Sequence, residues 1–174
     1  SPTPMTILPA RHRCPEDGRE FVGEPYDGIS MRRTVLQCAG EYFVDFFTVE
    51  ATRPGPTALV TANVHGDEIT GVGAVHALAE VLDGTLKAGR VHLYPSLNPD
   101  GLAARTRKVP PDGPDLNRLF PGRADGPPAQ RLARVIWEEL RERRPDLVVD
   151  LHADAPAAIP YAIVDRAVSL GGTR

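Results

Sequence analysis

Two short apolar, β-branched runs, each followed at once by a histidine, constrain the fold of this chain most strongly. Residues 58–64 read Ala-Leu-Val-Thr-Ala-Asn-Val and lead into His65, and residues 147–151 read Leu-Val-Val-Asp-Leu and lead into His152. Such runs are typical of buried strands. In open α/β sheets, ligands bind beyond the carboxyl ends of the strands. The sequence therefore predicts that both histidines lie at the ligand-binding edge of one sheet.

The remaining patterns predict a three-layer α/β fold, with a mixed, mostly parallel sheet and helices on both of its faces. Further strands are expected over residues 34–38, 42–49, 90–95 and 161–164. Apolar residues at helical spacing predict helices over residues 68–82 and 129–143. Because right-handed crossovers join parallel strands, the ends of the two histidine-bearing strands should meet at the same edge.

A long segment over residues 96–128 holds many turn formers and few periodic apolar residues. A loop of this length inside a compact domain is usually functional or disordered. It contains Arg105 and Arg107 and, further along, Asn117 and Arg118, which offer donors suited to a carboxylate. The arginines indicate a small anionic substrate or an anionic transition state; taken one at a time, each is more typical of a solubilising loop residue.

His65, Glu68 and His152 together are the ligand set of a catalytic zinc site. Two imidazoles and one carboxylate fill three corners of a tetrahedron and leave the fourth for water or substrate. A structural zinc site would more commonly be closed by four ligands, mostly Cys, and the chain has only Cys14 and Cys38. Each residue alone would be read as an ordinary buried or solvated side chain, so the prediction depends on the set.

Composition favours a single globular domain of 174 residues, with 41% hydrophobic and 25% charged residues. The division expected is an irregular, Pro- and Gly-rich segment over residues 1–30, followed by one α/β domain over residues 31–174. A net charge of -3 favours neither a nucleic-acid nor a membrane partner. The N-terminal residues lack the apolar region of a signal peptide, so a cytoplasmic location is expected.

Four motifs occur in a fixed order along the chain: His-Gly-Asp-Glu at 65–68, Asn-Pro-Asp-Gly at 98–101, Asp-Leu-Asn-Arg-Leu-Phe-Pro-Gly at 115–122, and Asp-Leu-His at 150–152. In this order they resemble the zinc metallocarboxypeptidase clan. Within that clan, the chain is most similar to the succinylglutamate desuccinylase/aspartoacylase branch. The resemblance implies a zinc carboxypeptidase-like fold.

The resemblance implies that His65, Glu68 and His152 bind one Zn²⁺ per chain. By the same similarity, Asp115 matches a carboxylate that orients the imidazole of a ligand, a role for which metal sites have a clear need. The remaining histidines match no ligand position; they are His12, expected in a tail, His76, expected on a helix face, and His92, expected in a strand.

Substrate-binding residues are also implied by the resemblance. Asn117 and Arg118 match the pair that grips the carboxylate of the substrate. Arg107 matches the catalytic arginine that polarises the scissile carbonyl, with Arg105 as the competitor for this role.

The function implied is that of a zinc-dependent amidohydrolase that removes the acyl group from an N-acyl amino acid. The alternatives are a metallocarboxypeptidase that cleaves the C-terminal residue of a short peptide, and a non-catalytic zinc-binding module. The family's general base is a Glu well downstream of the last zinc-binding His, but only Asp154 and Asp165 are acidic after His152. We therefore expect a chain truncated at the C-terminus, with an exposed sheet edge. The acyl group, the amino acid and the oligomeric state stay open.

Overall fold

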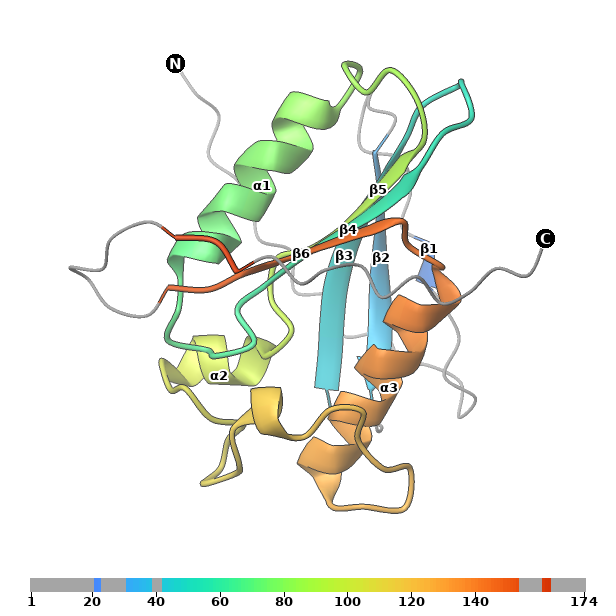
Figure 1. Ribbon diagram of the computed structural model, residues 1–174. Coiled ribbons are helices and arrows are strands. Elements are labelled where there is room, and N and C mark those ends of the chain that lie inside the picture. Colours follow the sequence, from blue (N-terminus) through green and yellow to red (C-terminus); the bar gives the residue numbers. More distant parts are fainter. Residues whose placement is uncertain (1–20, 23–30, 39–41, 154–160, 164–174) are drawn as a thin grey trace.

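The computed structural model describes residues 21–22, 31–38, 42–153 and 161–163 (Figure 1). Its strands are β1 (Phe21–Val22), β2 (Met31–Cys38), β3 (Tyr42–Glu50), β4 (Thr57–Ala62), β5 (Arg90–Tyr94) and β6 (Leu147–Leu151). Its helices are α1 (Thr70–Leu82), α2 (Pro99–Ala104), the 3-10 helix η1 (Leu116–Arg118) and α3 (Pro128–Glu142). The strands form one six-stranded sheet in the order β1-β2-β3-β5-β4-β6.

The sheet is mixed, as the sequence predicts, but parallel pairing does not predominate. β4 is parallel to both of its neighbours, β5 and β6, whereas the other three strand pairs are antiparallel. The prediction of a mostly parallel sheet is therefore wrong at the level of strand pairs. Residues 39–41 between β2 and β3 are too few for the crossover that parallel pairing requires.

Helices cover both faces of the sheet, so the three-layer arrangement is confirmed (Figure 1). The face toward α3 carries Phe46, Leu59 and Tyr94, which pack with Leu132 and Ile136 of the helix. The face toward α1 carries the neighbouring strand residues Val49, Val60 and Leu93, with Val75 and Ala79 of the helix. Adjacent strand residues such as Leu59 and Val60 thus enter opposite cores, as the alternation of side chains along a strand requires.

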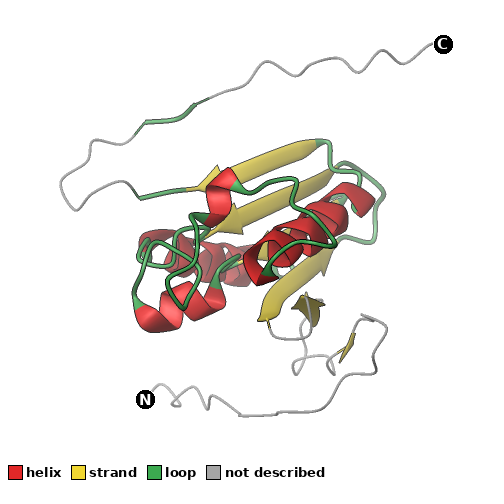
Figure 2. Cartoon of the chain, turned by 90° about the horizontal axis from the view of Figure 1, so that it is seen from below, coloured by secondary structure: helices red, strands yellow, loops and turns green. Residues whose placement is uncertain are grey.

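The parallel strands β4 and β6 lie side by side, and Ala62 is the register partner of Leu151. Their carboxyl ends therefore meet at one edge, as the two histidine-bearing runs predict. Figure 2 shows loops gathered at the end of the sheet toward which these strands point. The two short helices α2 and η1 lie within the segment 96–128, where the sequence predicts no regular elements.

β6 is an edge strand of the described sheet, and Leu147, Val148 and Val149 are exposed, whereas Leu151 is half-buried. Leu147 is 56% exposed and Val148 is 54% exposed, so the prediction that this run forms a buried strand is wrong, whereas the expected exposed edge is present. A short apolar run cannot reveal whether anything covers the faces of its strand. Within the described residues, no helix is long and apolar enough to cross a membrane.

One further expectation is wrong, and a second needs a correction. Residues 161–163 do not form a strand, and Phe21–Val22 forms β1 inside the segment expected to be irregular. The rest of residues 1–30, together with Asp154 and Asp165, lies outside the described residues. The division of the chain at residue 30 stays a prediction.

Candidate metal centre

The turn after β4 is built around Asn63, which is fully buried and has a left-handed backbone, with φ of 56°. Its Nδ2 donates to the carbonyl oxygens of His65 (2.8 Å) and Glu68 (3.1 Å). Its Oδ1 accepts a hydrogen bond from Ser96 Oγ (2.7 Å), which follows β5. Asn tolerates the left-handed region better than most residues. One amide therefore fixes the turn that carries two of the three predicted ligands.

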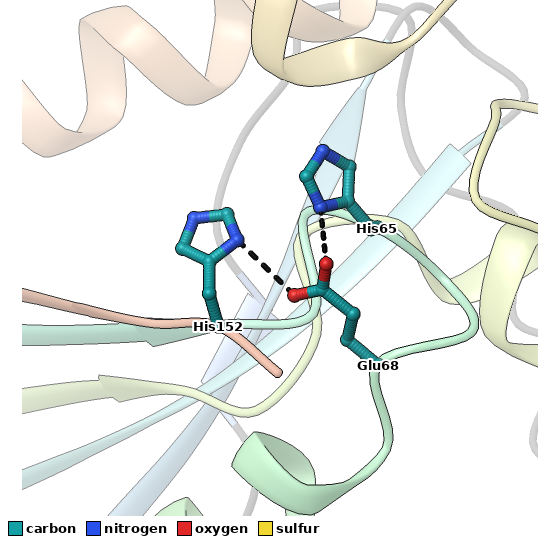
Figure 3. A group of neighbouring side chains, drawn as sticks. All are labelled: His65, Glu68 and His152. Carbon is teal, nitrogen blue, oxygen red and sulfur yellow. Dashed lines mark hydrogen bonds and ion pairs between the residues drawn. The ribbon is translucent and has the colours of Figure 1, made fainter. Parts of the chain in front are cut away.

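His65, Glu68 and His152 converge at this edge of the sheet (Figure 3). His65 Nδ1 lies 2.6 Å from Glu68 Oε1, and His152 Nδ1 lies 3.1 Å from Glu68 Oε2. One ligand atom from each residue lies within 4.8 Å of the others. The backbone N–H of Ala153 also donates to Glu68 Oε2 (2.9 Å). The predicted convergence of these three side chains is confirmed.

The chemistry and geometry of these donors suit a divalent cation. Both imidazoles turn Nδ1 toward the Glu68 carboxylate, so two nitrogen atoms and the oxygen atoms of one carboxylate face a common centre. This donor set is one that Zn²⁺ prefers. His65 and Glu68 are buried, whereas the His152 side chain is 29% exposed, which leaves access from solvent on one side.

Asp115 lies beside the other nitrogen of His65, with Oδ1 3.2 Å from Nε2. The contact is close enough for electrostatic attraction but too poorly aligned for a hydrogen bond, so the buried His65 Nε2 has no hydrogen-bond partner among the described residues. This placement agrees with the orienting role that the resemblance implies for Asp115.

The charge of Asp115 is stabilised from several sides. Burial raises the pKa of its carboxyl, but the hydrogen bond from the Asn117 N–H and the nearby His65 and Arg107 together hold the pKa below its usual value. Arg107 Nε donates to Asp115 Oδ2 (3.3 Å), and its Nη1 lies 3.5 Å from Glu68 Oε1. Arg107 therefore lies at the candidate metal centre.

The other predicted site residues lie in η1 and at the end of α2. Asn117 and Arg118 belong to η1 and are exposed, so their role in binding a substrate carboxylate stays a prediction. Arg105, the competitor of Arg107, is exposed at the C-terminal end of α2, where its backbone is left-handed with φ of 52°.

His76 and His92 lie where the sequence places them. His76 is an exposed residue of α1 whose ring contacts Phe47, with ring centroids 5.5 Å apart. His92 is a buried residue of β5, and its Nδ1 lies 2.9 Å from Thr48 Oγ1. His12 lies outside the described residues, as does Cys14.

Sequence reasoning missed two residues that shape the site. Asn63 could be suspected only as an Asn that directly precedes the end of a strand run. Asp150 accepts hydrogen bonds from Thr61 Oγ1 and His152 Nε2, both at 2.8 Å. The available signal was its spacing, because residues two apart in a strand point to the same face.

The sequence is similar to those of a known family and of a characterised relative. The sequence pattern described as "Succinylglutamate desuccinylase/Aspartoacylase catalytic domain" matches residues 54–166, more than half of the chain. The chain is 38% identical over 117 residues to the N-alpha-acetyl-L-2,4-diaminobutyric acid deacetylase of Halomonas elongata, a match that covers 66% of this chain and 34% of that protein.

Solved structures show the same fold. A crystal structure of an aspartoacylase family protein from Mesorhizobium loti is 32% identical, with a TM-score of 0.63 over 76% of this chain and 43% of that one. A metallo-carboxypeptidase from Pseudomonas aeruginosa shares the fold at 24% identity, with a TM-score of 0.58 over 69% of this chain and 34% of that one. The chain thus spans less than half the length of these relatives. With its four ordered motifs and the matching region at 54–166, the chain belongs to the succinylglutamate desuccinylase/aspartoacylase family.

Proposed function

We propose that this chain holds the zinc-binding part of an amidohydrolase that removes the acyl group from an N-acyl amino acid. The observation that carries the proposal is the convergence of His65, Glu68 and His152, with both Nδ1 atoms turned toward one carboxylate. The similarity to a deacetylase of an N-acetylated amino acid supports the same class of substrate.

A bound zinc ion would act as a Lewis acid on the scissile carbonyl and lower the pKa of a bound water. Arg107, whose guanidinium lies 3.5 Å from Glu68, would donate to the oxyanion that develops on that carbonyl. Asn117 and Arg118 of η1 would bind the carboxylate of the substrate and hold the amide in register.

The proposed substrate is small and anionic, because the residues assigned to it are donors. The exposed guanidinium groups of Arg107 and Arg118 and the amide of Asn117 are suited to carboxylate oxygens. An N-acyl amino acid has one free carboxylate beside the amide to be cleaved. Asn117 and Arg118 would bind this carboxylate, and Arg107 would donate to the oxyanion that forms at the amide.

Zinc content is the first test of the site. Elemental analysis of the protein should find about one zinc ion per chain, and His65→Ala should lower it sharply. His76→Ala is the matched control, since His76 is an exposed histidine of α1 whose ring packs on Phe47. Equal zinc in the wild type and in His65→Ala would count against the site.

Substrate trials separate the proposed function from its alternatives. A full-length form should hydrolyse N-acetyl and N-succinyl amino acids and should not hydrolyse short unblocked peptides. Cleavage of the peptides alone would instead indicate a carboxypeptidase. Stoichiometric zinc without turnover of either kind of substrate, even when the downstream sequence is restored, would indicate a non-catalytic zinc-binding module.

A further inference from the structure

Asp150 connects the sheet to the second imidazole of the candidate metal centre. Thr61 Oγ1 donates to Asp150 Oδ1, and the other carboxylate oxygen, Oδ2, lies 2.8 Å from His152 Nε2. Thr61 and Asp150 are register partners in the parallel pair of β4 and β6. Asp150 lies in β6 and His152 directly follows the strand, and the contact between their side chains shows that both lie on the same side of it.

The bond to Asp150 determines which nitrogen of His152 carries the proton. An ionised carboxylate can only accept hydrogen bonds, so His152 Nε2 must be the donor. In the neutral imidazole the lone pair then lies on Nδ1, which faces Glu68 Oε2 at 3.1 Å. Two acceptor atoms this close together suit a cation shared between them. The proton on Nε2 thus presents His152 in the form that binds a metal ion.

The His152 ring is less constrained by its surroundings than the His65 ring, so a hydrogen bond that fixes its orientation matters more. The His65 side chain is 3% exposed and is held by its surroundings, whereas the His152 side chain is 29% exposed beyond an edge strand. Asp150 is itself 42% exposed, but its partner Thr61 is 2% exposed and anchored inside the sheet. A buried hydroxyl therefore fixes an exposed carboxylate, which in turn fixes an exposed imidazole.

We propose that Asp150, anchored by Thr61, is a positioning residue that holds the His152 ring and its Nε2 proton so that Nδ1 is directed at the metal. The inference rests on the proposed zinc site. Each imidazole then has a carboxylate beside its second nitrogen. Asp150 of β6 serves His152, and Asp115 of the segment 96–128 lies beside His65. Carboxylates behind ligand imidazoles commonly orient the ring and raise its basicity.

A purely structural role would predict a different pattern of variants. Asp146, which directly precedes β6, also links this strand to β4, since its Oδ2 accepts a hydrogen bond from the Thr57 N–H (2.8 Å). Asp146→Ala therefore removes a comparable tie between the same two strands, far along β6 from the imidazole. If Asp150 serves only to pair the strands, the two alanine variants should behave alike.

The experiment measures Zn²⁺ affinity by competition with a chelating indicator, together with the visible absorption spectrum of bound Co²⁺. Asp150→Ala is expected to bind Zn²⁺ about 10- to 100-fold more weakly and to change the Co²⁺ spectrum. Thr61→Val should shift both in the same direction by less, because Asp150 keeps its bond to His152. Asp150→Asn should retain more affinity than Asp150→Ala, since its amide oxygen can still accept from Nε2. Asp146→Ala should match the wild type.

Thermal unfolding of each variant separates loss of fold from loss of positioning. Wild-type affinity in Asp150→Ala would overturn the inference and leave the zinc site standing. An equal loss in Asp146→Ala and Asp150→Ala would overturn it in favour of a strand tie. Failure of the wild type to bind zinc would instead overturn the proposed site, and the inference with it.

Discussion

Gly66 and Gly101 pack backbone against backbone, so closely that a Cβ atom on Gly66 would lie 2.0 Å from the carbonyl carbon of Gly101. Gly66 lies between the proposed ligands His65 and Glu68, whereas Gly101 belongs to α2 in the segment 96–128. Helix α2 therefore packs directly on the turn that carries these two ligands. Two motifs noted in the sequence, His-Gly-Asp-Glu and Asn-Pro-Asp-Gly, thus contact each other through their glycines.

Gly66→Ala should disturb the metal centre, because the added methyl group meets backbone atoms that cannot rotate away. We expect weaker zinc binding and an unfolding free energy lowered by about 1–3 kcal/mol, the usual cost of overpacking. Chemical denaturation and a zinc competition assay measure the two effects. Gly73→Ala on α1 is the control: its Cβ would meet nothing within 4 Å, so it should be neutral or slightly stabilising. Normal zinc binding by Gly66→Ala would show that the contact is not needed.

Asn63 should be as important to the turn as the ligands themselves. Asn63→Ala leaves the carbonyls of His65 and Glu68 without their buried donor and puts an Ala in the left-handed region. We expect a loss of about 2–4 kcal/mol in the unfolding free energy. Asn63→Gly should recover about 1 kcal/mol of that loss, because glycine removes the backbone strain but not the missing hydrogen bonds. Equal stability of both variants would show that strain contributes little.

The sequence is most informative where periodicity and strand ends coincide. The runs at 58–64 and 147–151 predict strands whose ends bring His65 and His152 to the same edge of the sheet. In the structure these strands, β4 and β6, are parallel and also adjacent. This works because a parallel sheet aligns the carboxyl ends of its strands, whatever the details of packing. Helix α3 is found one residue from its predicted bounds, because its apolar residues recur at helical spacing.

The sequence reveals neither the short capped helices of the segment 96–128 nor the contacts between distant residues. α2 and η1 are short and are capped by Asn98 and Asp115, whose side chains accept from backbone N–H groups three and two residues ahead. Such local caps give no periodic signal. The role proposed for Asp150 requires the register that pairs it with Thr61, and an apolar run such as 147–151 does not show which faces are covered.

Arg107 and Arg105 give a matched pair for testing the proposed chemistry. Arg107 contacts Glu68 and Asp115, whereas Arg105 is exposed at the end of α2. In a full-length form, Arg107→Ala should lower kcat for an N-acyl amino acid by roughly 10²- to 10³-fold, with zinc content preserved. Arg105→Ala should leave both near the wild-type values. Steady-state kinetics with elemental analysis measures the pair, and an equal loss of kcat in Arg105→Ala would contradict the assignment.

His92 should make the stability of the fold depend on pH. Burial, with the positive charges of Arg143 and Arg90, lowers the pKa of His92 from 6.5 to about 4 against the opposing effect of Glu50. The buried ring also meets Thr48 Oγ1 through Nδ1. Between these two pKa values the unfolded chain binds a proton at His92 that the folded chain does not. The stabilisation present above pH 6.5 is therefore lost as pH falls toward 4, by at most about 3 kcal/mol.

His92→Gln removes this titration while keeping a polar side chain opposite Thr48. Unfolding free energies measured in urea from pH 7 to pH 4.5 should fall more steeply for the wild type than for His92→Gln. His76→Gln is the control, because His76 is exposed on α1, so its slope should follow the wild type. The same slope in the wild type and in His92→Gln would show that His92 is protonated equally in the folded and unfolded states. Its burial would then carry no proton-linked cost, because only a difference in bound protons between the two states makes stability vary with pH.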